Sequence, residues 1–470
     1  MRKTKIICTL GPKTDDAETL RAMIHAGMNV ARLNFSHGSF PEHQKRIDMV
    51  KALRDELGKP VAILLDTKGP EIRIGAFIDG TVELACGQLF TLTTEQTEGD
   101  SSRVSVSYKN LPRVLAPGDR VLMDDGLIEL SVTECTETTV TGLIKNGGRL
   151  SNNKSINLPG IHIDMPYMTE RDRQDILFGV KNDVDFVAAS FVRDASDVQA
   201  VRRLLDEAGG KEIKIIAKLE NAEGIENADE ILAEADGIMI ARGDMGVEVP
   251  LEMLPSIQKQ LIKKCYFAGK SAITATQMLE SMIHHPRPTR AEVTDIANAI
   301  YDGTGAIMLS GETAAGAYPV ESVATMDKIA EATEKSINYV GRFQRDTVRN
   351  HTITDAVSHA ACTTAIDLSA AGIVVLTCSG HTARMISKFR PNCPIIAAAV
   401  NRKSYYQLAL SWGVLPLLND MQSTTEELFA SAIEKAENTA LFEPGDILIM
   451  TSGWAAGTDS ETNTMRVYTV

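Results

Sequence analysis

The sequence contains no apolar run long enough to span a bilayer, which argues against an integral membrane protein. Its seven cysteines are an odd number and form no CxxC pair, so we interpret them as free thiols in a reducing compartment. The first residues, MRKTKIICTLGPK, reach Gly11 and Pro12 too early to hold the apolar segment of a signal peptide. Together these absences predict a cytoplasmic protein.

Basic residues are outnumbered, with 48 Lys and Arg against 62 Asp and Glu, for a net charge of −14. This balance argues against nucleic acid or an anionic membrane as a partner, although a local basic pocket is compatible with it. No Ser-His-Asp set stands out in the sequence. The chain of 470 residues is long enough for about two to four domains and a sizeable core.

The stretch IKIIAKLENAEGIE, residues 213–226, holds the first candidate site. It reads as a short strand, and Lys218 and Glu220 are two residues apart at its end, so both side chains point to one face. A second apolar run, GIMIARGD, ends in Asp244. Two carboxylates on neighbouring strand ends suit Mg²⁺ or Mn²⁺, and an ammonium beside them can stabilise developing charge. A simple salt bridge at the strand end explains the stretch equally well.

Strand-like apolar runs recur along the chain, and most are followed by a segment with helical spacing. Eight such runs are KIICTLGP, MNVARLNFS, VAILLDTKG, VDFVAASFV, IKIIAKLE, GIMIARGD, SAITATQM and AIMLSGE. Helical spacing is found over residues 16–26, 42–57, 195–208 and 254–268, among others. Near-continuous apolar strands alternating with helices indicate an α/β protein whose parallel sheet is covered on both faces. Eight units predict a closed (β/α)8 TIM barrel.

Polar residues collect at the C-terminal ends of these eight runs, where barrels of this type place their chemistry. They are Arg32, Asn34, Ser36, Asp66, Lys68, Ser190, Lys218, Glu220, Asp244, Thr276 and Ser310. Polar side chains at buried strand ends are costly unless they have a role. The clustering therefore indicates an enzyme.

About a hundred residues of different character separate the third and fourth runs. From residue 72 to 166 the sequence has short alternating strands, with turns at Pro117 and Gly118 and at Asp125 and Gly126. The predicted strands are TVELACG, LFTLTT, RVSVSY, DRVLMDD and LIELSV. We interpret this segment as a small β-barrel inserted in a barrel loop, where it could act as a lid that excludes water.

The last part of the chain reads as a further α/β unit. A helical pattern over residues 320–337 is followed by GRFQRDTVRN, which we interpret as a linker, and then by the strands GIVVLTCS, PIIAAAV, DILIMTSG and MRVYTV. The first of these strands leads through Ser379 and Thr382 to a helix beginning near Ala383. Hydroxyl groups at a helix N-terminus suit a phosphate, and they also suit an ordinary N-cap.

Six motifs of the chain strongly resemble pyruvate kinase. They are MNVARLNFSHG, LLDTKGPEIR, IIAKLENAEGI, MIARGDMGVE, ITATQMLESMIHHPRPTRAE and DGTGAIMLSGETAAGAYP. The resemblance covers nearly the whole chain, including the position of the insertion, and the length is similar to the compact bacterial form without a C-terminal extension. It implies a catalytic barrel at residues 1–70 and 167–344, an inserted lid domain at 71–166 and a regulatory α/β domain at 345–470.

The resemblance implies phosphoryl transfer from phosphoenolpyruvate to ADP, giving pyruvate and ATP in the final step of glycolysis. By position, Lys218 would neutralise charge on the transferring phosphoryl group and on the enolate oxygen. Thr276 would protonate the enolate carbon through a water relay with Ser310. Arg73 would hold the phosphate, and Arg32 would help to order the site.

The resemblance also implies ligand-binding residues. Glu220 and Asp244 would hold Mg²⁺ or Mn²⁺, and main-chain groups at Gly243 and Asp244, with Thr276, would receive the substrate carboxylate. The substrate-binding set is Arg32, Lys218, Gly243, Asp244 and Thr276. The ligands implied for K⁺ are Asn34, Ser36, Asp66 and Thr67. The residues implied to face the nucleotide are Asn34, Phe35, Ser36, His37, Arg73 and Lys154.

An effector site and a homotetramer are implied in the same way. The residues that match a sugar-phosphate pocket are Thr377, Ser379, Gly380, His381, Thr382, Arg384, Trp454 and Gly457. Some activated relatives carry lysine where this chain has His381, and a largely neutral imidazole binds a dianionic phosphate less well at pH 7. The identity of the effector therefore stays open.

Several of these residues have simpler interpretations when each is taken alone. Thr276 can be a plain strand-end hydroxyl, His37 a surface histidine and Asp66 a helix N-cap. Thr289 and Glu292 read as a helix capping box. Two other functions fit parts of the pattern: a Mg²⁺-dependent lyase or aldolase acting on a 2-oxo acid, and a metabolite-binding regulator without catalysis. Lys218, the inserted β domain and the cation ligands Asn34, Ser36 and Asp66 favour the kinase over the lyase. The presence of all the charged site residues argues against a regulator without catalysis.

Overall fold

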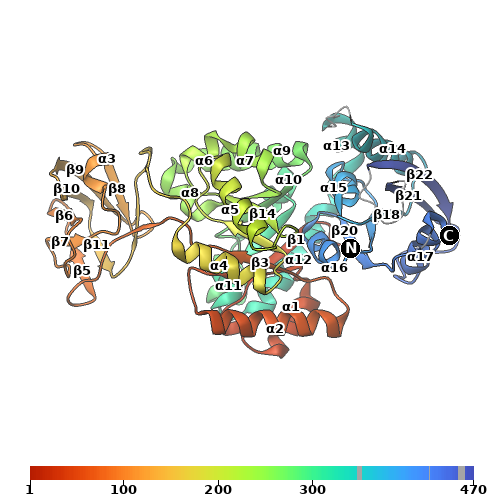
Figure 1. Cartoon of the computed structure of the whole chain (residues 1–470), viewed down its shortest axis with the longest axis horizontal. Helices are drawn as coiled ribbons and strands as arrows, with labels where there is room; N and C mark the ends of the chain where they lie inside the picture. The colour runs from red at the N-terminus through yellow and green to blue at the C-terminus, as the bar shows by residue number, and fades with distance from the viewer. Residues whose placement is uncertain (347–351, 423, 454–460) are drawn as a thin grey trace.

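The computed structural model describes residues 1–346, 352–422, 424–453 and 461–470. Three parts follow one another along the long axis of the molecule: a small β part, a central barrel and a C-terminal α/β part (Figure 1). Within the described residues, no helix has both the length and the apolar character that crossing a membrane requires.

The central part is a closed barrel, in the order β1-β17-β16-β15-β14-β13-β3-β2. All of its neighbouring strands pair in parallel. The strands are β1 (Lys5–Thr9), β2 (Val30–Asn34), β3 (Ala62–Asp66), β13 (Phe186–Ala189), β14 (Lys214–Leu219), β15 (Gly237–Ala241), β16 (Ser271–Ala275) and β17 (Ala306–Leu309). Each lies within one of the eight apolar runs, so the predicted (β/α)8 barrel is confirmed.

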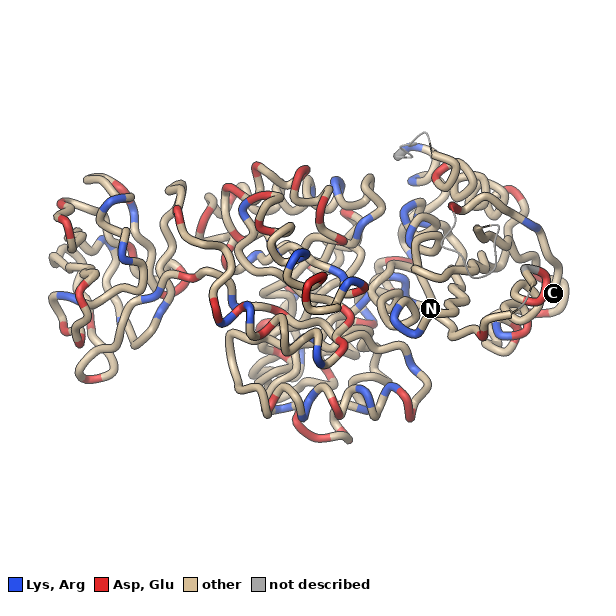
Figure 2. Tube along the Cα trace, in the orientation of Figure 1, with Lys and Arg blue, Asp and Glu red and all other residues tan. Residues whose placement is uncertain are grey.

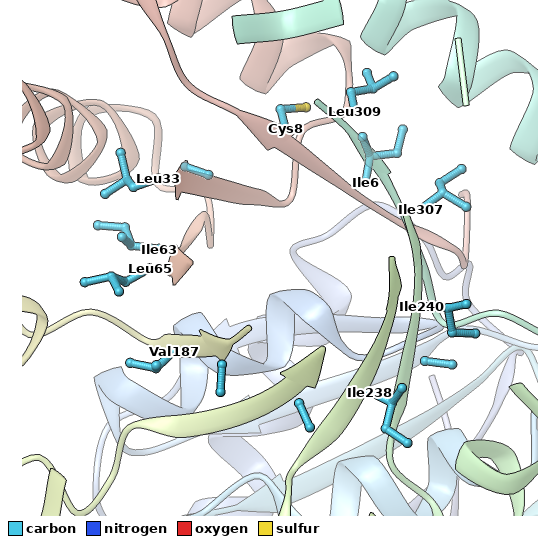
Figure 3. Close-up of a cluster of buried hydrophobic side chains, with 14 of the residues drawn as sticks. Ile6, Cys8, Leu33, Ile63, Leu65, Val187, Ile238, Ile240, Ile307 and Leu309 are labelled. Carbon is cyan, nitrogen blue, oxygen red and sulfur yellow. The ribbon is translucent and has the colours of Figure 1, made fainter. Parts of the chain in front are cut away.

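Side chains of the barrel strands alternate between two cores. Outward-pointing residues such as Ile63, Leu65 and Val187 lie between the strands and the surrounding helices (Figure 3). Inward-pointing residues such as Ala62 and Leu64 fill the barrel interior. Because both faces are covered, each strand needs apolar residues at nearly every position, which explains why the runs do not alternate with polar residues.

Helices cover the outside of the barrel. They are α1 (Ala17–Ala26), α2 (Phe40–Leu57), α4 (Glu170–Lys181), α5 (Ala195–Glu207), α6 (Ala222–Glu226), α7 (Ala228–Glu234), α8 (Arg242–Glu248), α9 (Leu254–Ala268), α10 (Arg290–Asp302), α11 (Gly311–Ala314) and α12 (Pro319–Lys335), with the 3₁₀ turns η1 (Pro12–Thr14), η2 (Leu251–Met253) and η3 (Glu280–Ile283). Helix α2 begins two residues before the predicted start, because Ser39 and Glu42 form a capping box and Pro41 fits the first turn.

The insertion is a curled sheet of seven strands, in the order β4-β12-β8-β9-β10-β6-β7, beside a two-stranded sheet of β11 and β5. A bridge between Ile74 and Val106 brings the two edges of the larger sheet together. Its elements are β4 (Ile72–Arg73), β5 (Thr81–Leu84), β6 (Leu89–Thr93), β7 (Arg103–Ser105), α3 (Leu111–Val114), β8 (Arg120–Met123), β9 (Ile128–Cys135), β10 (Thr139–Asn146), β11 (Gly148–Ser151) and β12 (Ser155–Asn157).

Strand β10 was not among the predicted strands, because glycine weakens a strand pattern. In the fold Gly142 is needed there, since a Cβ at this position would lie 2.2 Å from Leu130 Cδ2 of the neighbouring strand β9.

The C-terminal part is a five-stranded sheet in the order β20-β19-β18-β21-β22. Its elements are α13 (Tyr339–Asp346), α14 (Ile353–Asp367), β18 (Gly372–Thr377), α15 (His381–Lys388), β19 (Ile395–Ala399), α16 (Arg402–Gln407), η4 (Leu408–Leu410), β20 (Val414–Leu418), α17 (Thr425–Glu437), β21 (Ile447–Gly453) and β22 (Thr462–Thr469). Helix α13 occupies the first half of the predicted linker and crosses the boundary predicted at residue 344, because Tyr339 and Phe343 give it an apolar side that is buried.

The C-terminal part closes the N-terminal end of the barrel. Ala409 and Leu410 of η4 are buried in the same cluster as the inward-pointing strand residues. Beside them Gln407 Nε2 donates to the carbonyls of Asp185, at 3.1 Å, and Glu212, at 2.7 Å, just before strands β13 and β14. The polar residues at the C-terminal strand ends therefore lie at the opposite end of the barrel from this contact.

Candidate active site

Lys218 lies at the centre of a buried polar network at the C-terminal ends of the barrel strands. Its Nζ donates to Asp66 Oδ1 at 3.0 Å and to Ser190 Oγ at 2.6 Å, and lies 2.9 Å from Glu220 Oε1. Strand β14 supplies Lys218, and β3 supplies Asp66. Ser190 and Glu220 directly follow β13 and β14. Adjacent parallel strands thus deliver all four groups to one place.

A second cation completes the network from the other side. Arg32 Nε donates to Asp66 Oδ2 at 2.6 Å, and Arg32 Nη1 donates to Thr9 Oγ1 at 2.9 Å. Asp66 is fully buried and Lys218 is 8% exposed, so this carboxylate bridges a guanidinium and an ammonium away from water. The interpretation of Asp66 as a helix N-cap is therefore wrong.

The pKa values of these groups reflect burial and charge together. Burial opposes the ionisation of Asp66, but Arg32 and Lys218 outweigh it and lower the pKa of the carboxyl. Burial likewise opposes the charge on Lys218, but Asp66 and Glu220 outweigh it and raise the pKa of the ammonium. Both groups stay charged across the neutral range, as a site for anionic ligands requires.

Glu220 and Asp244 form a second, acidic half of the site. Burial raises the pKa of Glu220 to about 7, and it also raises the pKa of Asp244, which lies in hydrogen-bonding range of Glu220. Glu220 Oε2 accepts the main-chain N–H of Phe191 at 2.7 Å. Two neighbouring carboxyls whose pKa values are both raised by burial fit a divalent cation, and Mg²⁺ often takes one or two carboxylates plus substrate oxygens. In the described ranges, no group of three or more acidic, His or Cys side chains is arranged as metal ligands.

The ends of β15 and β16 face each other across a close contact. A Cβ added to Gly243 would lie 2.9 Å from Thr276 Cγ2, so only glycine lets these two strand ends approach. Thr276 has a left-handed backbone with a φ of 73°. Ser310 follows β17, the next strand of the barrel, and its N–H donates to Glu312 Oε2 at 2.7 Å.

Arg73 and Lys154 lie on the insertion rather than in the Lys218 network. Arg73 pairs with Glu71 at 2.7 Å and donates to the carbonyl of Asn153, also at 2.7 Å. Lys154 Nζ lies 2.8 Å from Asp124 Oδ1. A cavity of about 400 Å³ separates the insertion from the rim of the barrel, and its lining includes Ile72, Ile156, Phe191 and Asp244. Arg73 and Lys154 therefore make these contacts with residues of the insertion itself.

The loop after β2 lies beside Asp66. Asn34 and Asp66 are register partners, and the main-chain N–H of Phe35 donates to the carbonyl of Asp66 at 2.9 Å. The Phe35 ring is buried and stacks on His43 at 4.0 Å, so only main-chain atoms of Phe35 can meet a ligand. His37 is exposed at the rim.

The predicted effector residues gather between β18 and α15 in the C-terminal part. Gly380 has a φ of 80° and its N–H donates to Thr377 Oγ1 at 3.0 Å. Arg384 Nη2 donates to the carbonyl of Ser379 at 3.2 Å, and helix α15 begins at His381, two residues before the predicted start. Trp454 and Gly457 lie outside the described residues.

The sequence pattern assigns no specific role to three residues of this site. Ser190 holds Lys218, Thr9 holds Arg32, and Arg242 bonds to the backbone around Thr276. Each stands at or directly after the end of a predicted strand. Ser190 already belongs to the polar strand-end set, and the same position is the signal that could have found Thr9 and Arg242.

Comparisons with known proteins agree with the geometry. The family described as "Pyruvate kinase, barrel domain" matches residues 1–323, and "Pyruvate kinase, alpha/beta domain" matches residues 355–468. A pyruvate kinase of Sporosarcina psychrophila is 50% identical over 475 residues, covering 100% of this chain and 81% of that protein. A pyruvate kinase of Clostridium acetobutylicum is 47% identical over 473 residues, covering 100% of both chains. One of Bacillus licheniformis is 48% identical over 473 residues, covering 100% of this chain and 81% of that protein.

Proposed function

The chain belongs to the pyruvate kinase family, and from this premise we propose how its own residues carry out the reaction. The protein transfers the phosphoryl group of phosphoenolpyruvate to ADP, giving pyruvate and ATP in the final step of glycolysis. Enzymes of this family need a divalent metal ion. The observation that carries the residue assignment is the buried ammonium of Lys218, held by Asp66, Ser190 and Glu220.

Lys218 stabilises the negative charge of the transferring phosphoryl group and then of the enolate oxygen. Phosphoryl transfer depends mainly on positioning and on neutralising charge spread over the phosphoryl oxygens. Lys218 suits this role because its charge is oriented by three oxygen atoms before substrate arrives. Arg32 keeps Asp66 ionised and so orients Lys218, and Arg73 grips the phosphate when the insertion closes.

Glu220 and Asp244 hold the divalent ion, Mg²⁺ or Mn²⁺. A bound divalent ion supplies positive charge that neutralises the phosphoryl and enolate oxygens. The raised pKa values of both carboxyls support this assignment, because burial leaves them short of compensating positive charge.

Thr276, with Ser310 on the next strand, handles the proton that converts the enolate to pyruvate. Main-chain groups of Gly243 and Asp244, with the Thr276 hydroxyl, receive the substrate carboxylate. The close approach of Gly243 to Thr276 supports this pairing, because it puts the two strand ends within reach of one small ligand.

The loop after β2 serves both a monovalent cation and the nucleotide. Asn34, Ser36, Asp66 and Thr67 bind K⁺; support comes from the register pairing of Asn34 with Asp66. The nucleotide lies against His37 and the main chain of residues 34–36, and Arg73 and Lys154 reach it from the insertion.

Several wider features follow from the family and complete the proposal. Residues 1–70 with 167–344 form the catalytic domain, 71–166 a lid and 345–470 a regulatory domain, and four chains assemble into a cytoplasmic homotetramer. A phosphorylated sugar binds between β18 and α15, where the residues Thr377, Ser379, Gly380, His381, Thr382 and Arg384 gather. Activation curves with a panel of sugar phosphates and AMP would identify the effector.

Substitution of Lys218 tests the central assignment. We expect Lys218→Met to lower kcat by about 10²–10³-fold, the usual cost of removing one preorganised charge-stabilising group. Pyruvate formation from phosphoenolpyruvate, ADP and Mg²⁺ would be measured on protein whose circular dichroism matches the parent. The control is Lys264→Met, a half-buried lysine that pairs with Asp229 on the outer helices and should keep full activity. A Lys218→Met protein with unchanged kcat would refute the role of Lys218, while the family activity would stand.

A further inference from the structure

Two consecutive residues after β16 have left-handed backbone, although neither is glycine. Thr276 has a φ of 73° and Gln277 a φ of 55°. Such backbone is sparsely populated for residues with a Cβ, and it persists where surrounding contacts hold it. The pair includes the threonine proposed to handle the proton, so the question is which contacts hold it.

Arg242, the residue before Gly243, supplies those contacts. Its Nε lies 3.2 Å from the carbonyls of both Ala275 and Thr276, and its Nη2 donates to the Thr276 carbonyl at 2.7 Å and to the Gln277 carbonyl at 3.3 Å. Nη2 also lies 2.9 Å from Met278 Sδ. One guanidinium thus spans the whole left-handed turn and ties the start of α8 to the end of β16.

Helices α9 and α10 in turn hold the Arg242 guanidinium, from the side opposite the turn. Arg242 Nη1 lies 2.7 Å from Asp295 Oδ2 of helix α10, and it donates to Gln258 Oε1 of helix α9 at 3.3 Å. The Arg242 side chain is 9% exposed and that of Asp295 is 38% exposed, so the guanidinium is buried while its anchor lies partly in solvent. A planar group with five N–H donors fits this task, whereas a lysine ammonium could hold only part of it.

We propose that Arg242 is a positioning residue for protonation of the enolate: anchored by Asp295, it holds Thr276 and Gln277 in the left-handed turn and so aims the Thr276 hydroxyl. This inference rests on the proposed role of Thr276. In that step a solvent proton reaches the enolate methylene carbon through Thr276. The carbon–carbon π electrons form the new C–H bond, and an oxygen electron pair restores the carbonyl. Arg242 touches neither the carbon nor the proton.

The proton step can be followed separately from phosphoryl transfer. Exchange of the pyruvate methyl hydrogens with D₂O, in the presence of Mg²⁺ and ATP, reports it by NMR. We expect Arg242→Met to slow this exchange by about 100-fold, the usual effect of misplacing a reacting group by about 1 Å. Arg242→Lys should slow it nearly as much, because one ammonium cannot span the turn. Exchange within about threefold of the parent in both variants would overturn the proposal.

A second substitution, Gln277→Gly, tests whether the exchange lost in Arg242→Met can be restored. Glycine adopts a φ of 55° without strain, so Gln277→Gly should restore at least about tenfold of the exchange lost in Arg242→Met. A role of Arg242 in general stability would not be rescued in this way. The matched control is Arg54→Met, which removes another buried Arg–Asp pair, with Asp185, at the opposite end of the barrel. It should leave the exchange rate unchanged; a loss like that of Arg242→Met would overturn the proposal.

A folding measurement separates this proposal from the role of Thr276. If Thr276→Ala exchanges at the parent rate, Thr276 does not handle the proton and that part of the proposed function fails. The hold of Arg242 on the turn is then tested by the urea concentration at the unfolding midpoint. Gln277→Gly should raise this midpoint more in Arg242→Met than in the parent protein. Equal shifts in the two backgrounds would overturn the role of Arg242.

Discussion

At the scale of single residues, the site is a set of buried charges that compensate one another. Asp66 lies between Arg32 and Lys218, and Lys218 lies between Asp66 and Glu220. Removing one partner from such a network leaves an uncompensated buried charge, which costs more than the pair itself contributes to stability. The arrangement keeps Lys218 charged and oriented without substrate, so little reorganisation is needed when an anion binds.

If Glu220 holds the metal ion as proposed, the same burial makes metal binding depend on pH. Burial raises the pKa of Glu220 to about 7, so a proton competes with the metal for this carboxylate near neutral pH. We expect the apparent Kd for Mn²⁺ to rise up to about tenfold per pH unit below about pH 7 and to level off above about pH 8. Electron paramagnetic resonance of free Mn²⁺ in titrations from about pH 6 to about pH 8 would measure it. An affinity that stays constant over this range would contradict the assignment of Glu220.

At the scale of elements, helix α10 is fixed to the barrel by its first turn. Thr289 Oγ1 accepts the N–H of Glu292 at 3.2 Å, and Glu292 Oε2 accepts the N–H of Thr289 at 2.7 Å. Glu292 also accepts the N–H and the hydroxyl of Ser281 in η3, at 2.7 and 2.6 Å. The predicted capping box is confirmed. Because α10 carries Asp295, this cap also helps to place the anchor of Arg242.

Removing this cap should destabilise the protein by a predictable amount. We expect Thr289→Ala to lower the free energy of unfolding by about 1 kcal/mol, the typical loss for an N-cap threonine. Glu292→Ala should cost more, since it also releases Ser281 and its hydrogen bonds involve a charge. Urea unfolding followed by circular dichroism measures both. Thr294→Ala, an exposed mid-helix position of α10, is the control and should change the value by less than about 0.5 kcal/mol. Equal effects at positions 289 and 294 would contradict the capping role.

At the scale of the whole molecule, the barrel is closed at one end and open at the other. The C-terminal part seals the N-terminal strand ends with Leu410, and the insertion stands at the opposite, catalytic end (Figure 1). Acidic and basic residues are interspersed over all three parts (Figure 2). Within this acidic chain, Arg32 and Lys218 place two buried cations together in the barrel mouth, as the expectation of a local basic pocket requires.

The packing of Leu410 into the N-terminal end of the barrel should couple the unfolding of the barrel to that of the C-terminal part. Leu410 is 1% exposed, so Leu410→Ala should cost about 2–5 kcal/mol and separate one calorimetric transition into two. The control is Leu428→Ala, in a core confined to the C-terminal part, which should lower the stability of that part alone. A single transition at the parent temperature in Leu410→Ala would show that the Leu410 contact does not couple the two parts.

The sequence by itself determined the features that depend on the spacing of residues along the chain and on the order of its elements. It predicted all eight barrel strands, the pairing of Lys218 with Glu220 on one strand end and the capping box at Thr289, because side chains at fixed spacing share a face whatever surrounds them. Only the tertiary structure decided that Ser190 holds Lys218, that Arg242 spans the turn at Thr276 and that Leu410 packs into the N-terminal end of the barrel. These contacts join residues from different strands and helices, and their geometry depends on strand register and helix packing, which no local pattern encodes.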